Sequence, residues 1–157
     1  MTTIAYPSEL FPGPPSVAVD LPADWTAVRV PGTLLAARRT DSDGRFAPNL
    51  VIRGFTRSGD FSLGMALREL KEFVDQRDGG TMDDPFEVSI DEVPYVGINV
   101  SWTDDNVGDV VQAHLFAGAR RGQVIDLVQV TGSVGGEHVA TQYETVQQVM
   151  QTVRITR

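Results

Sequence analysis

His114 and His138 are the two residues of this chain best suited to move protons near neutral pH. His114 lies in the run DVVQAHLFAG and Asp126 lies in the next extended run, so the two side chains could meet as the base and carboxylate of a hydrolase. No serine stands in a context that would activate it. His114 also shares its side of the strand with Val110 and Phe116, which favours a hydrogen-bonded, partly buried structural histidine. We therefore predict a protein that is not an enzyme, with the His114–Asp126 hydrolase as an unfavoured alternative.

The glycine-rich stretch GSVGG (132–136) lacks the chemistry of an active-site loop. A nucleophile elbow needs Gly where this chain has Thr131, and a phosphate loop needs Lys where Glu137 follows the glycines. The acidic stretch that begins at Asp41 has Phe46 where a calcium loop needs Gly. Two isolated histidines and no cysteine make a poor metal site. We therefore expect no metal and no cofactor.

Aromatic residues with polar tips and one acidic loop favour binding over catalysis. In the first interpretation the protein is an adaptor that presents a sheet edge or loop rim to a protein partner, with Trp102 beside the loop TDDNVGD. In the alternative it carries a small apolar or sugar-like ligand in a pocket between sheet and helix. The candidate binding residues of these two interpretations are Tyr95, Trp102, Asp104, Asp105, His114 and Tyr143.

The charge and composition limit the kind of partner and the compartment. The net charge is −8, from 21 acidic and 13 basic residues, which argues against nucleic acid because phosphate binding needs a basic surface. The first residues have neither a basic nor an apolar signal region, no long apolar span follows, and cysteine is absent. We therefore expect a cytoplasmic protein with a protein partner and no membrane contact, and a homodimer remains open.

The elements that must position these residues follow from periodicity. Residues 1–15 hold four of the nine prolines and read as an irregular arm, and residues 16–157 read as one domain. Leu63, Leu67, Leu70 and Val74 indicate a helix over 61–77, capped by Asp60 or Ser62, and a second helix covers 137–152. Extended runs are expected at 17–22, 28–39, 49–57, 86–90, 93–102, 109–118, 123–132 and 153–155.

Central runs that are apolar on both sides need cover on both faces. Because the runs are joined by tight turns, neighbouring strands should be antiparallel. We therefore predict an α+β fold in the form of a three-layer α/β/α sandwich, with a central antiparallel sheet of about six to seven strands flanked by helices.

The stretch RFAPNLVI (45–52) opens a strand with two residues that strands disfavour. The Asp-Gly pair within 40–45 indicates a hairpin turn just before it. Pro48 fixes φ and biases Ala47 toward extended geometry, so the chain leaves the turn already straight. Asn49 is expected to hydrogen-bond a neighbouring backbone group rather than a ligand.

VAVDLPADW (17–25), FAPNLVI (46–52), the single helix that follows, and the strand block closed by a C-terminal helix resemble the LpqN-type proteins of actinobacteria. These belong with PsbP and the Ran-binding Mog protein in one fold superfamily, and the resemblance covers residues 11–157. It implies a single PsbP/Mog-like domain, an antiparallel sheet between helices, and a non-enzymatic binding or assembly role. Some members are envelope lipoproteins, but the printed chain departs from that pattern because it has no lipidation cysteine.

Overall fold

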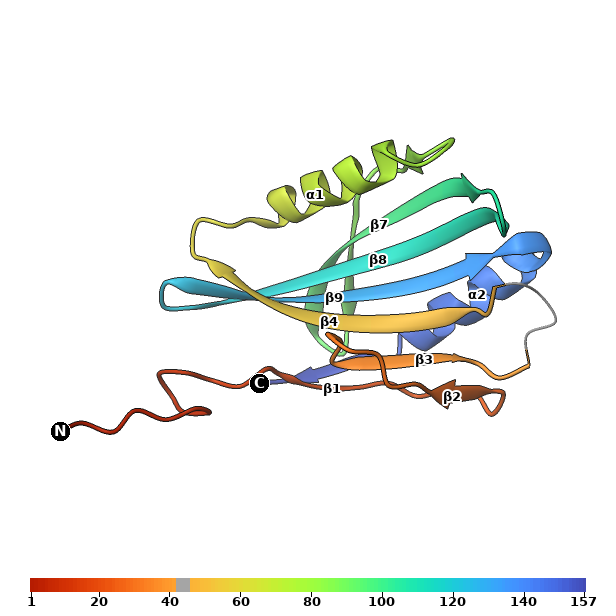
Figure 1. Ribbon diagram of the computed structural model, residues 1–157. Helices are drawn as coiled ribbons and strands as arrows, with labels where there is room; N and C mark the ends of the chain where they lie inside the picture. The colour runs from red at the N-terminus through yellow and green to blue at the C-terminus, as the bar shows by residue number, and fades with distance from the viewer. Residues whose placement is uncertain (42–45) are drawn as a thin grey trace.

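One long antiparallel sheet carries the fold (Figure 1). The computed structural model describes residues 1–41 and 46–157. Within that part of the chain, the main sheet has eight strands in the order β2-β3-β4-β9-β8-β7-β5, with β6 also paired to β7. Its strands are β2 (Trp25–Ala27), β3 (Leu35–Arg39), β4 (Asn49–Ser58), β5 (Thr81–Met82), β6 (Phe86–Ile90), β7 (Val93–Asp104), β8 (Gly108–Arg121) and β9 (Val124–Gly135). A separate two-stranded ribbon pairs β1 (Ser16–Ala18) with β10 (Arg154–Thr156).

The three longest strands at the centre, β7, β8 and β9, follow each other along the chain and pair as hairpin neighbours. The turn between β8 and β9 uses Gly122, whose φ of 58° lies in the left-handed region that glycine enters without steric cost. Register then places His114 opposite Thr131. Because side chains alternate along a strand, this register decides which polar residues share a face.

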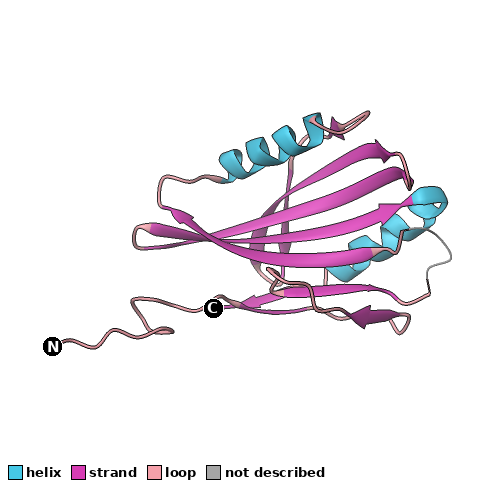
Figure 2. Cartoon of the chain, in the orientation of Figure 1, coloured by secondary structure: helices cyan, strands magenta, loops and turns pink. Residues whose placement is uncertain are grey.

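Each of the two helices buries one apolar side. Helix α1 (Leu63–Asp75) is two residues shorter at each end than the predicted 61–77, and it uses one of the two predicted caps, because the Ser62 hydroxyl accepts a hydrogen bond from the Met65 N–H. Helix α2 (Val139–Met150) follows a single 3-10 turn, η1 (Gly136–His138). Figure 2 shows the two helices on either side of the sheet. The helices differ in how much of the sheet they cover.

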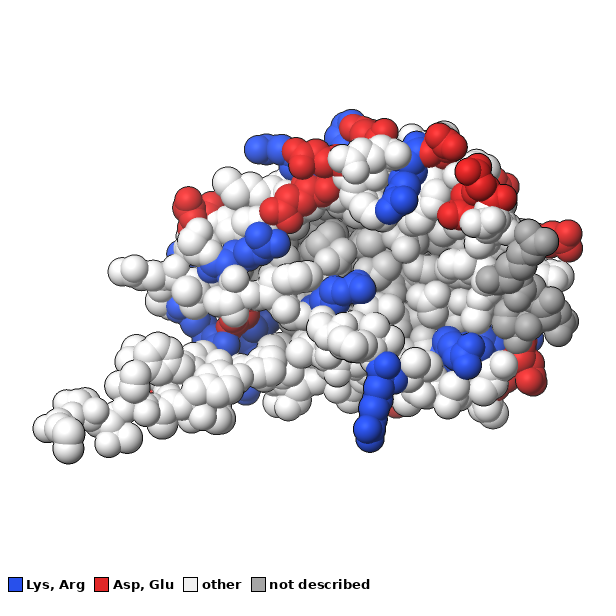
Figure 3. Space-filling view, viewed as in Figure 1, with Lys and Arg blue, Asp and Glu red and all other residues white. Residues whose placement is uncertain are grey.

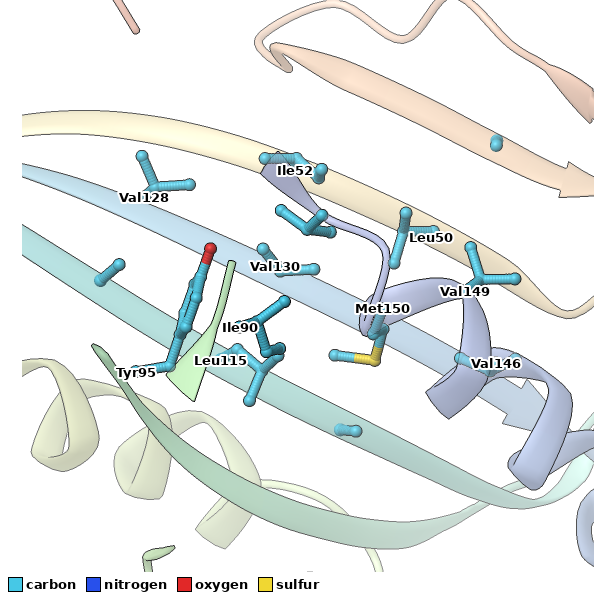
Figure 4. Packing of buried hydrophobic residues seen from close by; sticks show 14 of the residues in the cluster. Leu50, Ile52, Ile90, Tyr95, Leu115, Val128, Val130, Val146, Val149 and Met150 are labelled. Carbon is cyan, nitrogen blue, oxygen red and sulfur yellow. The ribbon is translucent and has the colours of Figure 1, made fainter. Parts of the chain in front are cut away.

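The face of the sheet toward α2, called the α2 face here, carries a cluster of buried apolar side chains (Figure 4). Tyr95 of β7 points into this layer beside Ile90 of β6. The ribbon of β1 and β10 adds Val17 and Ile155 at its edge. The main contributors from sheet and helix are Leu50, Ile52, Leu115, Val128, Val130, Val134, Val146, Val149 and Met150.

The opposite face, called the α1 face, is covered only in part. Helix α1 packs Ala66, Leu70 and Val74 against four residues of the sheet. These sheet residues, from β7, β8 and β9, are Ile98, Val100, Phe116 and Leu127. The face beyond this contact has no helix over it, as Figure 1 shows for β4 and β9.

The predicted α+β fold and antiparallel sheet are confirmed, but the count of strands is not, since the sheet has eight instead of six or seven. Both β2 and β5 are too short to show an alternating pattern. The three-layer sandwich is not confirmed: the layer on the α2 face also contains the ribbon of β1 and β10. The expected strand over 28–39 shortens to β3, and the hairpin turn predicted within 40–45 lies outside the described residues. Residues 1–15 form neither helix nor strand.

The interpretation of the stretch 45–52 is confirmed from Phe46 onward. The Asn49 side-chain amide donates to the Ala47 carbonyl oxygen at 3.1 Å. Buried Pro48 leads into β4, and its carbonyl oxygen accepts the Arg39 N–H at 2.9 Å. Asn49 therefore performs turn chemistry at the start of β4.

Candidate functional site

A group of polar side chains runs across the part of the α1 face beyond helix α1, and three of them, His114, Thr131 and Ser133, are buried. We call this group the polar track. Strand β8 contributes Gln112 and His114, and strand β9 contributes Gln129, Thr131 and Ser133. Register places Gln112 opposite Ser133 and His114 opposite Thr131, so all five side chains lie on one face.

The polar track is joined by hydrogen bonds that define the tautomer of His114. The Gln112 amide nitrogen donates to the Ser133 hydroxyl at 2.9 Å, so the Gln112 carbonyl oxygen is left to accept from His114 Nε2, at 2.8 Å. His114 Nδ1 then accepts from the Gln129 amide at 3.1 Å and from the Thr131 hydroxyl at 3.2 Å. Every contact is satisfied by a neutral imidazole that carries its proton on Nε2.

Burial keeps this imidazole neutral. Only 4% of His114 is exposed, and its ring lies nearly parallel to that of Phe116 at 6.3 Å between centroids. Desolvation, and secondly the positive charge of Arg53, lower the pKa of His114 from 6.5 to about 4. At neutral pH the polar track therefore has one hydrogen-bond pattern and does not act as a proton acceptor.

A cavity of about 170 Å³ opens between α1 and the sheet at one end of the polar track. Its apolar walls come from strands and helix together: Phe55, Phe116, Leu127, Ala66 and Leu70. Its polar lining is Gln129 of the polar track and the ion pair of Arg57 with Glu69, at 3.4 Å. The Arg57 guanidinium also lies over the ring of Phe55, 5.6 Å from its centroid.

Arg53 lies beside the cavity and differs from Arg57 in its ion pairing. It lies opposite Gln129 in the register of β4 and β9 and is half-buried. Within residues 1–41 and 46–157, no carboxylate forms an ion pair with Arg53. The groove, by which we mean this cavity and the sheet surface next to it, thus has the paired guanidinium of Arg57 in its lining and, beside it, that of Arg53, which no described carboxylate pairs.

Figure 3 shows this side of the molecule from outside. The surface is hollowed between α1 and the strands below it, and basic side chains stand along the hollow. Acidic and basic side chains both stand over α1. Basic side chains are thus present along the hollow, although the whole chain has a net charge of −8.

The residues predicted to line one pocket lie on two faces. His114 and Trp102 belong to the α1 face, whereas Tyr95 and Tyr143 pack on the α2 face. The Tyr143 hydroxyl donates to the Asn99 side-chain oxygen at 2.6 Å, and burial, then Asp83, raise its pKa. These four side chains do not converge on one ligand.

Tyr95 is buried, and its hydroxyl has no hydrogen-bond partner among the described residues. Burial, and secondly the charge of Asp91, raise the pKa of Tyr95, while Arg157 opposes the rise. Figure 4 shows its ring among aliphatic side chains, which is the position of a core residue.

Trp102 and the acidic loop form a rim at the other edge of α1. Trp102 is half-buried and meets Phe73 edge to face at 5.7 Å, and Arg77 lies 4.3 Å from the centre of the Phe73 ring. The Asp104 carboxylate accepts the N–H groups of Asn106 and Val107, at 2.8 and 3.1 Å, and so shapes the loop. Asp105 is exposed.

The His114–Asp126 pair considered from the sequence does not form. Asp126 points to the α2 face, where it accepts from Thr56 at 3.3 Å and pairs with Arg121. The predicted proximity was wrong because register places Asp126 opposite Ala119, five positions along β8 from His114 and on the other side of the sheet. Arg53, Gln112, Gln129, Thr131 and Ser133 were missed, although each is a polar residue at an alternate position of an apolar strand.

No group of three or more His, Cys, Asp and Glu side chains among the described residues is arranged to hold a metal ion. No helix in the same part of the chain is long and apolar enough to cross a bilayer.

Comparison with solved structures identifies the fold. LpqN of Mycobacterium tuberculosis, a protein involved in cell envelope biogenesis, superposes with a TM-score of 0.74 at 13% identity, over 93% of this chain and 86% of LpqN. The fold is LpqN-like. Cyanobacterial PsbP from Synechocystis follows with a TM-score of 0.57 at 15% identity, over 90% of this chain and 92% of that one. No family profile and no curated protein sequence matches the chain.

The resemblance predicted from the sequence is thus confirmed at the level of the LpqN-like, PsbP-type fold. The cytoplasmic location predicted from the sequence is wrong. The finding that overturns it is the likeness to LpqN, a protein involved in cell envelope biogenesis. The cytoplasmic prediction was based on the absence of a signal region from the sequence. Such an absence does not determine a compartment.

Proposed function

We propose that this protein is a non-enzymatic binding protein that holds a small ligand in the groove between α1 and the sheet. The observation that carries the proposal is the cavity of about 170 Å³, which combines an apolar wall with polar groups already fixed by hydrogen bonds. Ligand sites in proteins have this composition: mostly apolar walls and a few convergent polar groups. The likeness to LpqN supports a role outside the cytoplasm.

The size of the cavity limits the ligand. A cavity of about 150 Å³ lined by aliphatic and aromatic side chains holds a benzene molecule. The cavity beside α1 therefore has room for one ring or a short alkyl group, and larger ligands would extend along the uncovered α1 face.

A binding test can use two matched substitutions in the helices. Ala66→Leu fills the cavity, and Ala140→Leu makes the same change at an exposed site on α2. Small ring compounds titrated into 15N-labelled protein should shift the amide signals of Phe55, Leu70 and Gln129. We expect these shifts to be lost in Ala66→Leu and kept in Ala140→Leu. Shifts confined to the α2 face, or retained in Ala66→Leu, would contradict the proposal.

An adaptor that binds a protein at the rim of Trp102 is the second candidate. The rim stacks an exposed Phe73, a half-buried Trp102 and Arg77 in one cluster, and 39% of Phe73 is exposed. Aromatic residues and arginine dominate the energetic centres of protein interfaces. Phe73→Ala should weaken capture of a specific partner from a native extract about tenfold or more, whereas Met65→Ala, equally exposed on α1, should not. Equal capture by both variants would remove this candidate.

A further inference from the structure

Arg53 is the feature of the groove that the proposed function does not yet use. It is a half-buried cation opposite Gln129, a residue that lines the cavity, and it forms no ion pair with a carboxylate among the described residues. Removing a charge from water is costly unless an opposite charge compensates it. Arg57, two residues further along the same face of β4, shows the usual solution, because Glu69 of α1 neutralises it.

The surroundings of Arg53 leave a place for an anion. Gln129, directly across the strand pair, uses its amide nitrogen toward His114 and has no donor to its carbonyl oxygen among the described residues. Directly opposed side chains of an antiparallel pair have Cβ atoms about 5 Å apart, so a group bound by Arg53 also reaches Gln129. His114 cannot supply the missing negative charge and, being neutral, does not repel a ligand.

The charges around the groove indicate the net charge of the ligand. The pair of Arg57 and Glu69 is neutral, and Arg53 leaves one uncompensated positive charge in the groove. A singly charged carboxylate balances that charge and matches the planar guanidinium with two parallel hydrogen bonds. A doubly charged phosphate would leave an excess negative charge in a protein that already has a net charge of −8.

We propose that the groove binds a small monocarboxylic acid, with its ring or short alkyl body in the cavity between α1 and the sheet and its carboxylate on Arg53. This inference rests on the proposed function and names its ligand class. The apolar body contacts Phe55, Phe116 and Leu127, and Gln129 lies at the boundary between the apolar and charged parts.

The test compares benzoate with benzamide, a neutral molecule of nearly the same shape, by calorimetry and by 15N NMR on the wild-type protein. We expect benzoate to bind at least tenfold more tightly than benzamide, which corresponds to about 1.4 kcal/mol. Raising the salt concentration should weaken benzoate and leave benzamide unchanged, because salt screens only the charged ligand.

Two matched variants test whether Arg53 binds the carboxylate of the ligand. Arg53→Gln should reduce benzoate binding about tenfold to the level of benzamide, whereas Arg38→Gln removes the same charge from an exposed site on β3 and should keep the preference. Circular dichroism checks that both variants fold, and the comparison of ligands on the wild type holds even if one does not.

Three other outcomes overturn the inference in distinguishable ways. If benzoate and benzamide bind equally and shift Phe55 and Gln129, the groove is a site but not for an acid, and the proposed function stands. If the preference survives in Arg53→Gln, the carboxylate is held elsewhere. If neither compound shows saturable binding to the wild type, the acid site is refuted. The proposed function would then stand only if other ligands shift the amide signals of Phe55, Leu70 and Gln129 and Ala66→Leu abolishes these shifts.

Discussion

The two faces of the main sheet are built from alternate residues of the same strands, yet they bury different chemistry. Strand β9 directs Val128, Val130 and Val134 to the α2 face, where helix, ribbon and sheet close over them. It directs Gln129, Thr131 and Ser133 to the α1 face, where the helix covers only one end. The α2 face is mainly an apolar core, with the ion pair of Asp126 and Arg121 as a polar exception. The second face retains hydrogen-bonded polar groups beside a cavity, which costs stability that an apolar surface would not and is typical of a site rather than a core.

The largest difference between the faces should appear when neighbouring residues of β4 are truncated. Leu50 is fully buried on the α2 face, and Leu50→Ala should lower the free energy of unfolding by about 2–5 kcal/mol through lost burial and a residual cavity. Val51 is half-buried on the α1 face, and Val51→Ala should cost about 1 kcal/mol. Urea unfolding of both variants measures the two values. Equal losses would show that the α1 face is as tightly packed as the α2 face.

The pH dependence of stability should isolate the polar track. Because the pKa of His114 falls from 6.5 to about 4 on folding, the unfolded chain binds more protons between these values, and stability is lost as pH falls from about 6.5 to 4. Each unit of pKa difference is worth about 1.4 kcal/mol, so the loss attributable to His114 is about 3 kcal/mol.

His114→Gln should flatten this part of the profile, measured by urea unfolding at a series of pH values. His138→Gln, at an exposed position, is the control and should leave the slope in place. A slope that persists in His114→Gln would mean that carboxylates produce it.

The closeness of α2 to the sheet can be tested at Gly132. A Cβ at this position would lie 2.3 Å from a methyl carbon of Val146 and 2.6 Å from the sulfur of Met150. Gly132→Ala should therefore destabilise the protein by about 1–3 kcal/mol through overpacking. Adding Val146→Ala should restore part of the loss, and thermal unfolding of the single and double variants gives the coupling. Strict additivity would contradict a direct contact.

The smallest effect is expected at the start of β4. Asn49→Ala removes the hydrogen bond to the Ala47 carbonyl oxygen and should cost about 1 kcal/mol in the free energy of unfolding. Ligand binding in the groove should not change, because Asn49 lies opposite Ser133, at the end of the polar track away from the cavity. Calorimetric titration of the variant checks this, and a tenfold loss of affinity would place Asn49 in the site.

Features that depend on the residues of a single helix or strand could be predicted from the sequence. Features that depend on how two strands pair could not. The alternating residues of β7, the spacing of α1 and the Ser62 cap are local, so they predicted elements that the structure contains. The polar track depends on the turn at Gly122, which sets the register of β8 against β9 and brings Gln112 to Ser133. A shift of one residue in that turn would have put His114 beside different neighbours, and for the same reason the proximity to Asp126 was predicted wrongly. Short strands such as β2 and β5 are defined by their partners and have too few residues for a pattern of their own.

The ribbon of β1 and β10 has a consequence for how the molecule forms during synthesis. Its partners, Val17 and Ile155, are separated by almost the whole chain, and the ion pair of Asp20 with Arg154 lies beside it. The N-terminal strand therefore waits unpaired on the ribosome until α2 and the residues after it have emerged, since a contact so distant along the chain cannot close earlier. We expect its backbone amides to gain protection from hydrogen exchange after those of β8 and β9 during refolding. Strand β10 thus completes the ribbon whose other strand, β1, is translated much earlier.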